Sequence, residues 1–596
     1  MPILRRLVPA GSRQGRRPAL AGARHALSPR GALKLHEVDG AFLFALRAAL
    51  AMGLVAVPMA LAGRSDLAVY AMLGSLTTTF GRNLPYARRA RVLAVAAVAM
   101  TALVGCGAVL AVWARGAPGG AGVAVVVVAT ALVAGVSKFV CDAARLSGLG
   151  AVLLLFSFAV AANNTTTQAD VLPYTALAAA GAALAWLLGV LGRFVHPDRP
   201  QRVAVATALR KLADLLEASD AGDAPRQTRH RATVAVLHAY QCLGVAPPAG
   251  VPRAAAGRDT VFLRLTDLSW TLLIDSARRR TADPAATSEL LRGQARMLTD
   301  RRLRDPFVLE ELASRTGVSA AVPGLAEDAE RAGAAGPARE GPAARRATEL
   351  LMGARGGIEH YAVLAVPALR MALGTGVAGG VAALLGLERG YWAAISAAAV
   401  LHSVNLRTTA QRAAQRILGT VVGLLLAFGA LAAHLEPVAL TLLIVLLEFL
   451  LEYVVARNYA LGVVFLTPLA LLMSDLAAPA PPGELVLDRV LGSVVGIVVA
   501  LLCALLVVHD RAAVRVERAL EGCVEAADRA EHALAGRSGP PPAFVQVRLA
   551  MAVVELREAD DAAAGELWPA GIDPAELAAT EQRAYSLLAR LHRRQH

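Results

Sequence analysis

Cysteine is scarce in this sequence, with five residues in a chain of 596. None lies in a C-x-x-C pair, which argues against a cysteine zinc site and against a framework of structural disulfides. We therefore predict small buried side chains or free thiols at these positions. They are Cys106, Cys141, Cys242, Cys503 and Cys523.

Motifs of nucleotide, metal and catalytic sites are missing as well. No G-x-x-x-x-G-K-[ST] phosphate loop occurs, so the chain is not expected to be an ATP-driven pump by itself. The histidines near the apolar segments have no partner histidine at i,i+4 and no carboxylate triad, so we predict no metal site and no cofactor. Without a soluble catalytic constellation, we do not expect an enzyme. These histidines are His360, His402, His434 and His509.

Lysine is nearly absent, at Lys34, Lys138 and Lys211, and the formal net charge of +14 comes from arginine. The basic residues of the apolar regions stand beside hydrophobic runs rather than along one polar face. Positive charge therefore indicates membrane topology, and no nucleic-acid partner is predicted.

Long apolar runs dominate what is present, with 56% hydrophobic residues and a mean hydropathy of +0.52. They gather in two blocks, 41–195 and 361–509, each with about six runs near the length that crosses about 30 Å of hydrocarbon. In the first block they are Ala41 to Leu61, Leu67 to Phe80, Val92 to Trp113, Val123 to Val136, Leu146 to Ala162 and Val171 to Val195. In the second they are Ala362 to Leu385, Tyr391 to His402, Ile417 to His434, Val438 to Val455, Tyr459 to Met473 and Leu485 to His509.

The positive-inside rule orients these spans. Arg82, Arg88, Arg89 and Arg91 follow the second span, whereas the loop after the fifth carries no cation. Residues 1–40 are basic and contain no apolar signal region, so they predict a cytoplasmic tail. Both termini are then cytoplasmic, in a multi-pass protein of the cell membrane.

The remaining chain is amphipathic and helical. Residues 196–360 predict a cytoplasmic helical region with an Ala-, Gly- and Pro-rich linker from Ala320 to Ala344. Residues 510–596 predict a helical tail, which we expect to pack against that region. The fold class is thus an all-α membrane protein with two repeated bundles of about six transmembrane helices, a helical insert and a helical tail.

Two levels of repetition are visible. The order and spacing of Arg47, Tyr70 and Arg91 resemble those of Arg370, Trp392 and Arg416, which indicates a duplicated block. Within the second block, residues 415–423 match 488–496, so each block is interpreted as two inverted three-helix units. Convergence on a common small-residue packing pattern is the alternative. We predict helix packing at Gly419, Gly423, Gly492 and Gly496.

The second block resembles a known family. The order Arg370, Tyr391-Trp392, Arg407, Arg416-Ile417-Leu418-Gly419-Thr420 and Gly423 is similar to that of the fusaric acid resistance and aromatic acid exporter superfamily. The likeness is sharp over residues 369–426, and the first block lacks the tryptophan and both glycines. It implies a bacterial inner-membrane protein associated with efflux of aromatic carboxylic acids.

Polar residues at corresponding places in the two blocks are the candidate substrate site. Arg47 and Arg370 lie inside the first span of each block, where they snorkel to the interface or bind a carboxylate. The short second spans end in polar groups, a pointer to a transport site, although ordinary helix ends in the headgroups would look alike. Our substrate-binding candidates are Arg47, Arg370, His402, Asn405, Arg407 and Arg416.

Two carboxylates near mid-span are the candidates for ion coupling. Glu448 and Glu452 are one turn apart, and an acid at this depth costs about 2–3 kcal/mol, so each needs a partner or a wet cavity. They carry a coupling proton or form a structural pair with an arginine such as Arg489 or Arg370. Tyr391-Trp392 is interpreted as an interface anchor, with stacking on an aromatic substrate as the alternative.

We therefore predict an integral membrane transporter that exports organic acids, including aromatic ones, by secondary transport. The alternatives are an uncoupled anion channel and a non-transporting membrane scaffold. The expected partners are the lipid bilayer and a small organic anion, and assembly into a homo-oligomer is left open.

Overall fold

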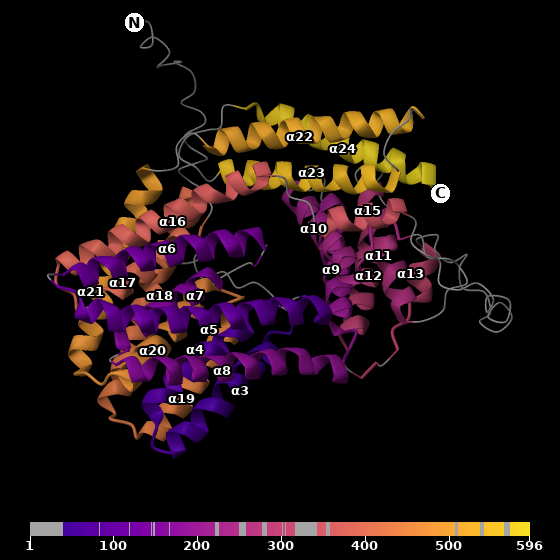
Figure 1. The fold of residues 1–596 in the computed structure, drawn as a ribbon. Coiled ribbons are helices and arrows are strands. Elements are labelled where there is room, and N and C mark those ends of the chain that lie inside the picture. Colours follow the sequence, from indigo (N-terminus) through magenta and orange to yellow (C-terminus); the bar gives the residue numbers. More distant parts are fainter. Residues whose placement is uncertain are drawn as a thin grey trace, which may run out of the picture. The chain divides into compact units, whose positions relative to one another are not determined.

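The computed structural model describes residues 40–595 apart from 83, 119, 145, 147–149, 166, 221–225, 250–257, 277–282, 301, 304, 316–341, 353–357, 404, 507–510, 537–541 and 565–571. The described residues contain helices and no strand, as predicted (Figure 1). They divide into two compact units. Unit 1 comprises 1–82, 90–189 and 362–507, and unit 2 comprises 83–89, 190–361 and 508–596. The predicted N-terminal tail 1–40, except for residue 40, and most of the predicted linker 320–344 lie outside the described residues.

Unit 1 contains the two apolar blocks, and each predicted span coincides with a helix. Block 1 consists of α3 (Ala41–Leu61), α4 (Ser65–Ser75) with the 3-10 turn η1 (Leu76–Thr79), α5 (Tyr86–Gly116), α6 (Ala121–Ala143), α7 (Gly150–Asn164) and α8 (Gln168–Val195). Block 2 consists of α16 (Ile358–Leu384), α17 (Tyr391–Leu401), α18 (Leu406–Ala432), α19 (Pro437–Val454), α20 (Tyr459–Ala477) and α21 (Pro482–Leu506). Among the described helices nine are long and apolar enough to cross a membrane, while α4, α7 and α17 are shorter.

The second and fifth helices of each block form the interior of unit 1. Every residue of α17 is buried, as are residues 150–162 of α7 and 68–75 of α4, and α20 is the most buried of the long helices. The other helices expose large apolar side chains, for example Val95 and Val98 on α5 and Leu442 and Leu446 on α19. A protein-buried helix need not span the hydrocarbon, which explains how the interior helices can be short.

Glycines set the helix pairs inside each block. A Cβ on Gly181 of α8 would lie 2.0 Å from the backbone oxygen of Ala71 in α4, and one on Gly496 of α21 would lie 2.4 Å from that of Ala393 in α17. The sixth helix therefore touches the second helix in both blocks. Similarly, Gly107 brings α5 onto α7, and Gly419 brings α18 onto α20. The third helix thus packs on the fifth in both blocks, as a duplicated unit would produce.

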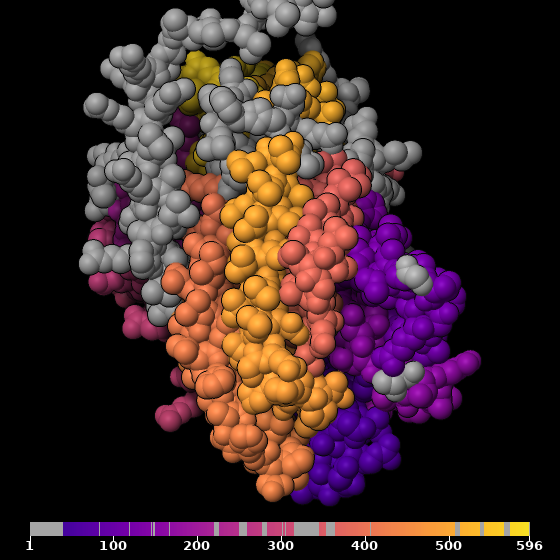
Figure 2. Space-filling model, turned by 90° about the vertical axis from the view of Figure 1, so that its left-hand side faces the viewer, coloured from indigo at the N-terminus to yellow at the C-terminus, as the bar shows by residue number. Residues whose placement is uncertain are grey.

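The contacts between the blocks are reciprocal. The first helix of block 1, α3, packs on the fourth helix of block 2, α19, where Gly53 faces Val445. The first helix of block 2, α16, packs on the fourth helix of block 1, α6, where a Cβ on Gly135 would lie 2.9 Å from Cβ of Ala372. Figure 2 shows this second contact from the side, with the salmon surface of α16 bordering the purple surface of block 1. This reciprocal packing is consistent with two related blocks that face each other about an axis along the membrane normal.

Unit 2 has its own apolar core. The insert contributes α9 (Arg199–Asp220), α10 (Arg226–Leu243), α11 (Arg258–Asp275), α12 (Pro284–Thr299), α13 (Glu310–Arg315) and α15 (Pro342–Leu351). The tail contributes α22 (Arg511–Leu534), α23 (Pro542–Ala563) and α24 (Pro574–Gln595). Insert and tail share one buried cluster, and the hydroxyls of Thr233 and Tyr585 hydrogen-bond across it at 2.9 Å. The tail therefore packs against the insert.

The three segments of unit 2 fold together, so we expect them on the same side of the membrane. These segments are the loop after the second span, the insert and the tail. Arg88 and Arg89, at the start of α5, belong to this unit, so the positive-inside rule predicts that it is cytoplasmic. Burial raises the pKa of the Cys242 and Cys523 thiols to about 12, which leaves both unreactive at neutral pH.

This topology predicts a labelling pattern. A cysteine introduced at the exposed Glu525 of α22 should react with a membrane-impermeant maleimide only after the cells are permeabilised. A cysteine at the exposed Glu436, before α19, should react in intact cells. The parent chain without the added cysteine is the control. Labelling of Glu525→Cys in intact cells would reverse the predicted orientation.

The helix contacts predict that alanine substitutions at two helical glycines have unequal effects on stability. In Gly74→Ala the new Cβ would lie 2.0 Å from the backbone oxygen of Ala178, so α4 and α8 must separate. We expect a loss of about 1–3 kcal/mol of stability, measured as a lower melting temperature in detergent. Gly380→Ala on α16 has no atom within 4 Å of its Cβ and should be neutral or stabilising. Equal melting temperatures for the two variants would contradict the close packing.

Candidate functional site

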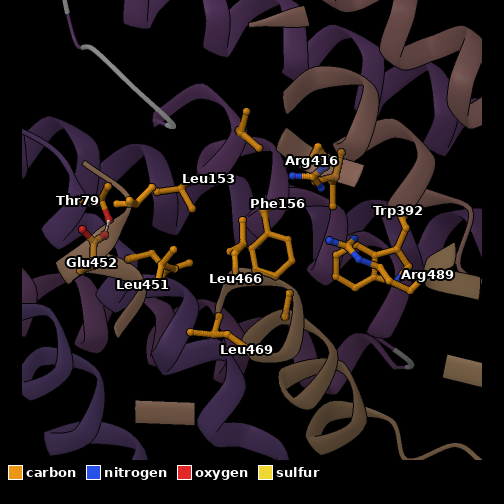
Figure 3. A pocket seen from close by; sticks show the side chains of 15 residues that line it. Thr79, Leu153, Phe156, Trp392, Arg416, Leu451, Glu452, Leu466, Leu469 and Arg489 are labelled. Carbon is orange, nitrogen blue, oxygen red and sulfur yellow. Dashed lines mark hydrogen bonds between the residues drawn. The ribbon is translucent and has the colours of Figure 1, made fainter. Parts of the chain in front are cut away.

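A cavity of about 40 Å³ lies among the interior helices of unit 1. Its lining comes from both blocks, with side chains from η1 and α7 of block 1 and from α17 to α21 of block 2. Figure 3 shows apolar side chains in the middle and charged side chains toward two ends. The cavity thus lies where the two blocks meet, among buried helices.

Two arginines mark one end of the cavity. Arg416 of α18 and Arg489 of α21 are each 1% exposed, and the Arg489 guanidinium carbon lies 3.9 Å from the centre of the Trp392 ring. Arg416 donates long hydrogen bonds of 3.4 Å to the Tyr459 and Ser396 hydroxyls. No carboxylate among the described residues forms an ion pair with either arginine. Stacking and long hydrogen bonds leave both guanidinium groups short of acceptors.

The unsatisfied atoms point to an anion. Nε of Arg416 and both Nε and Nη1 of Arg489 are buried without a hydrogen-bond partner among the described residues. Burying an unpaired cation costs several kcal/mol, and two neighbouring cations also repel each other. A carboxylate between them would offer acceptor oxygens to both planar guanidinium groups. This end of the cavity therefore presents two buried positive charges with unsatisfied hydrogen-bond donors.

The two arginines stand at matching places in the similar segments 415–423 and 488–496. Each stands three residues before a packing glycine, Arg416 before Gly419 and Arg489 before Gly492. Gly419 holds α18 against α20, and Gly492 holds α21 against Trp392 of α17. The two matching helices thus approach the interior from different sides and deliver equivalent arginines to one place.

A carboxylate marks the other end. Glu452 of α19 is 3% exposed and accepts a 2.7 Å hydrogen bond from the Thr79 hydroxyl on Oε1. Its backbone oxygen accepts a 2.7 Å hydrogen bond from Arg82, whose guanidinium stacks on Phe44 at 3.9 Å. Arg47 stacks on the same ring at 4.8 Å. Both blocks therefore contribute to this end as well.

Two comparisons with known proteins show sequence similarity. The family model described as "Fusaric acid resistance protein-like" matches residues 377–503, which include Arg416, Arg489, Trp392 and Glu452. The match runs from α16 to α21 of block 2.

One relative extends the likeness beyond these residues. The uncharacterized membrane protein YvaC of Bacillus subtilis (strain 168) is 24% identical over 577 residues, which cover 94% of this chain and 88% of the relative. The similarity therefore includes unit 2 as well as both blocks. No solved structure matches the chain.

The predicted site residues do not all gather at the cavity. Of the substrate-binding candidates, Arg416 lines it, and of the coupling candidates, Glu452 does. Glu448 is 1% exposed one turn before Glu452, but is not part of the lining. Arg489, which we interpreted only as a structural partner, lines the cavity beside Arg416. Its match to Arg416 in the repeat was the sequence signal that could have identified it.

The other candidates lie elsewhere in unit 1. Arg370 donates to the backbone oxygens of Leu401 and Ser403, at the carboxyl end of α17. The Asn405 side chain accepts from the Thr408 amide and begins α18, while Arg407 is exposed. These contacts, together with His402 next to them, organise the corner between α17 and α18. Arg47 lies near Glu452, and the described residues contain no cluster suited to a metal.

Block 1 carries a different pair at the matching position. Tyr174 stands seven residues before the packing glycine Gly181, as Arg489 stands seven before Gly496. Tyr174 stacks on Tyr70 with ring centres 3.7 Å apart, where block 2 has Arg489 over Trp392. The paired arginines are therefore a property of block 2.

The unsatisfied cation predicts a stability change that depends on anions. Arg489→Met should raise the melting temperature in anion-poor buffer by the equivalent of about 1 kcal/mol or more, because an apolar side chain replaces an unpaired buried charge. Benzoate should stabilise the unmodified chain and not the variant. The matched control is Arg370→Met, which removes an equally buried arginine that has backbone acceptors, and it should lower the melting temperature. Destabilisation of both variants to the same extent would contradict an unsatisfied Arg489.

Proposed function

We propose that this protein is a secondary transporter that exports small organic anions across the cell membrane and binds them in the cavity between its blocks. The observation that carries the proposal is the pair Arg416 and Arg489, buried and without a carboxylate partner among the described residues. Secondary transporters bind their cargo near the middle of the bilayer, where two repeats meet. The lining of the cavity by both blocks of unit 1 supports such a role.

The lining favours organic over inorganic anions. Beyond the arginines it consists mostly of apolar side chains such as Phe156, Leu466 and Leu469. Such surfaces bind the hydrocarbon part of an acid, and Trp392 adds an aromatic ring for stacking. Aromatic carboxylic acids are thus included in the proposed cargo.

The size of the cavity supports alternating access. A cavity of about 150 Å³ is needed to hold benzene, so 40 Å³ admits only a few water-sized molecules. An aromatic acid therefore requires the interior helices to separate. Movement of one block against the other would open the site toward one side of the membrane at a time.

Transport assays with arginine variants test this proposal. Arg416→Gln and Arg489→Gln should each lower benzoate uptake into proteoliposomes at least tenfold, because each removes a charge that holds the carboxylate. Arg389→Gln is the matched control, since Arg389 pairs with Asp488 and does not line the cavity. Uptake that is unchanged in both cavity variants would refute this binding site. Absence of flux for any anion would favour a membrane scaffold.

Coupling to protons is the second part of the proposal. Glu448 and Glu452 are buried acids on α19, one turn apart, and the second borders the cavity. Their position suits groups that take up and release a proton as the cargo moves.

An imposed pH gradient distinguishes a transporter from a channel. Benzoate flux should increase with the gradient in the unmodified protein, and Glu448→Gln should abolish this response because an amide cannot carry the proton. The variant is measured beside unmodified protein in the same liposomes. Flux that ignores the gradient and survives Glu448→Gln would indicate an uncoupled anion channel.

A further inference from the structure

One end of the cavity is closed by hydrogen bonds between the two blocks. Thr79 of η1 donates at 2.7 Å to Oε1 of Glu452 on α19, and the two side chains lie together at the end remote from Arg489 (Figure 3). Arg82, three residues after Thr79, donates at 2.7 Å to the backbone oxygen of Glu452. Both donors belong to block 1, whereas the acceptor belongs to block 2. Movement of the blocks away from each other would therefore break both bonds.

Aromatic side chains of α3 and α19 hold the same corner. The guanidinium carbon of Arg82 lies 3.9 Å from the centre of the Phe44 ring on α3, and that of Arg47 lies 4.8 Å from it. Phe42 of α3 meets Phe449 of α19 edge to face, with ring centres 5.7 Å apart. Cation–π and edge-to-face contacts are individually weak compared with the whole fold. This corner can thus separate without unfolding the helices that form it.

The matching corner of the repeat is built differently. There Lys138 of α6, the fourth helix of block 1, donates at 3.5 Å to the backbone oxygen of His402, which follows α17, the second helix of block 2. Its shorter bond, at 2.9 Å, goes to Asp142 in its own helix, and neither Lys138 nor His402 lines the cavity. Of the two corners, the one at Glu452 borders the cavity and has short bonds between the blocks.

We propose that Thr79, Arg82 and Glu452 form the cytoplasmic gate of the cavity. Arg82 lies in the loop after the second span, which the positive-inside rule predicts to be cytoplasmic. The gate opens when α3 and η1 move away from α19, which breaks both hydrogen bonds and admits the anion from the cytoplasm. Alternating access requires a site that opens to one side of the membrane at a time. The inference rests on the proposed function, since a gate presupposes a cargo that passes it.

Entry of a charged reagent into the cavity tests the gate. A cysteine replaces Ala470, which lines the cavity, in a full-length chain whose five native cysteines are alanine, and it reacts with 2-sulfonatoethyl methanethiosulfonate in inside-out vesicles. Thr79→Val combined with Arg82→Met removes both bonds between the blocks and should raise the reaction rate at least tenfold. Lys138→Gln, at the matching corner, is the control and should leave the rate unchanged. An equal rate in all three proteins, or an equal rise in the control, would overturn the inference.

A reversible crosslink tests the gate without removing its residues. Cysteines in place of Phe42 and Phe449, neither of which lines the cavity, are joined by a flexible bifunctional methanethiosulfonate. The link holds α3 against α19, so benzoate uptake into proteoliposomes should fall at least tenfold and return when the link is reduced. Each single-cysteine variant, treated in the same way, should keep its uptake. Full uptake by the crosslinked protein would contradict a gate that opens between these helices.

The outcomes separate the gate from the proposed function. In right-side-out vesicles the gate variant should react no faster than its parent, and a faster reaction there would refute a cytoplasmic gate. If benzoate transport requires Arg489 but neither the reagent nor the crosslink gives the expected change, the anion site stands and the gate fails. If the unmodified protein transports no anion, the proposed function fails and the gate fails with it.

Discussion

Close contact between helix backbones is the constraint on which this structure depends. In lipid, apolar side chains gain little by leaving one apolar surrounding for another, so helices associate through packing at small residues. Gly74, Gly181, Gly419 and Gly496 each lie where a single added carbon would meet a neighbouring backbone. The second and sixth helices touch in both blocks, as do the third and fifth. The first helix of each block packs against the fourth helix of the other block. The interior helices, including α7 and α17, are short and buried because these contacts surround them.

The cavity is a consequence of that packing. Helices α18 and α21 approach the interior through the glycines that follow Arg416 and Arg489, so both arginines reach one end of it. Their charges are expensive to bury without an anion. In the proposed function, a bound anion would offset this cost. Block 1, with Tyr70 and Tyr174 at the matching position, has no such cost.

The cavity lining is asymmetric although corresponding helix pairs approach closely in both blocks. Block 2 supplies both arginines and Glu452, whereas block 1 supplies Thr79 and apolar residues such as Leu153. Helix packing requires small residues only where helices cross. The side chains that face the cavity can therefore differ between the blocks without loss of that packing. Similar helix packing in the two blocks is therefore compatible with a cavity whose charged side chains come from block 2.

The amino-acid sequence by itself determined the helical class, the places of the twelve apolar segments and the helices of the insert and tail. These follow from local rules, since run length, helical spacing and turn residues act over a few neighbours. The match between Arg416 and Arg489 was also visible in the sequence. Only the tertiary structure decided which of these side chains share one cavity, because this depends on which helix faces cross. Helix packing brings Arg489 and Arg416 to one end of the cavity and Glu452 to the other end. It directs Arg370 to the end of α17 instead of the cavity. Residues far apart in the chain share a site only when backbones meet, and local sequence patterns do not specify those meetings.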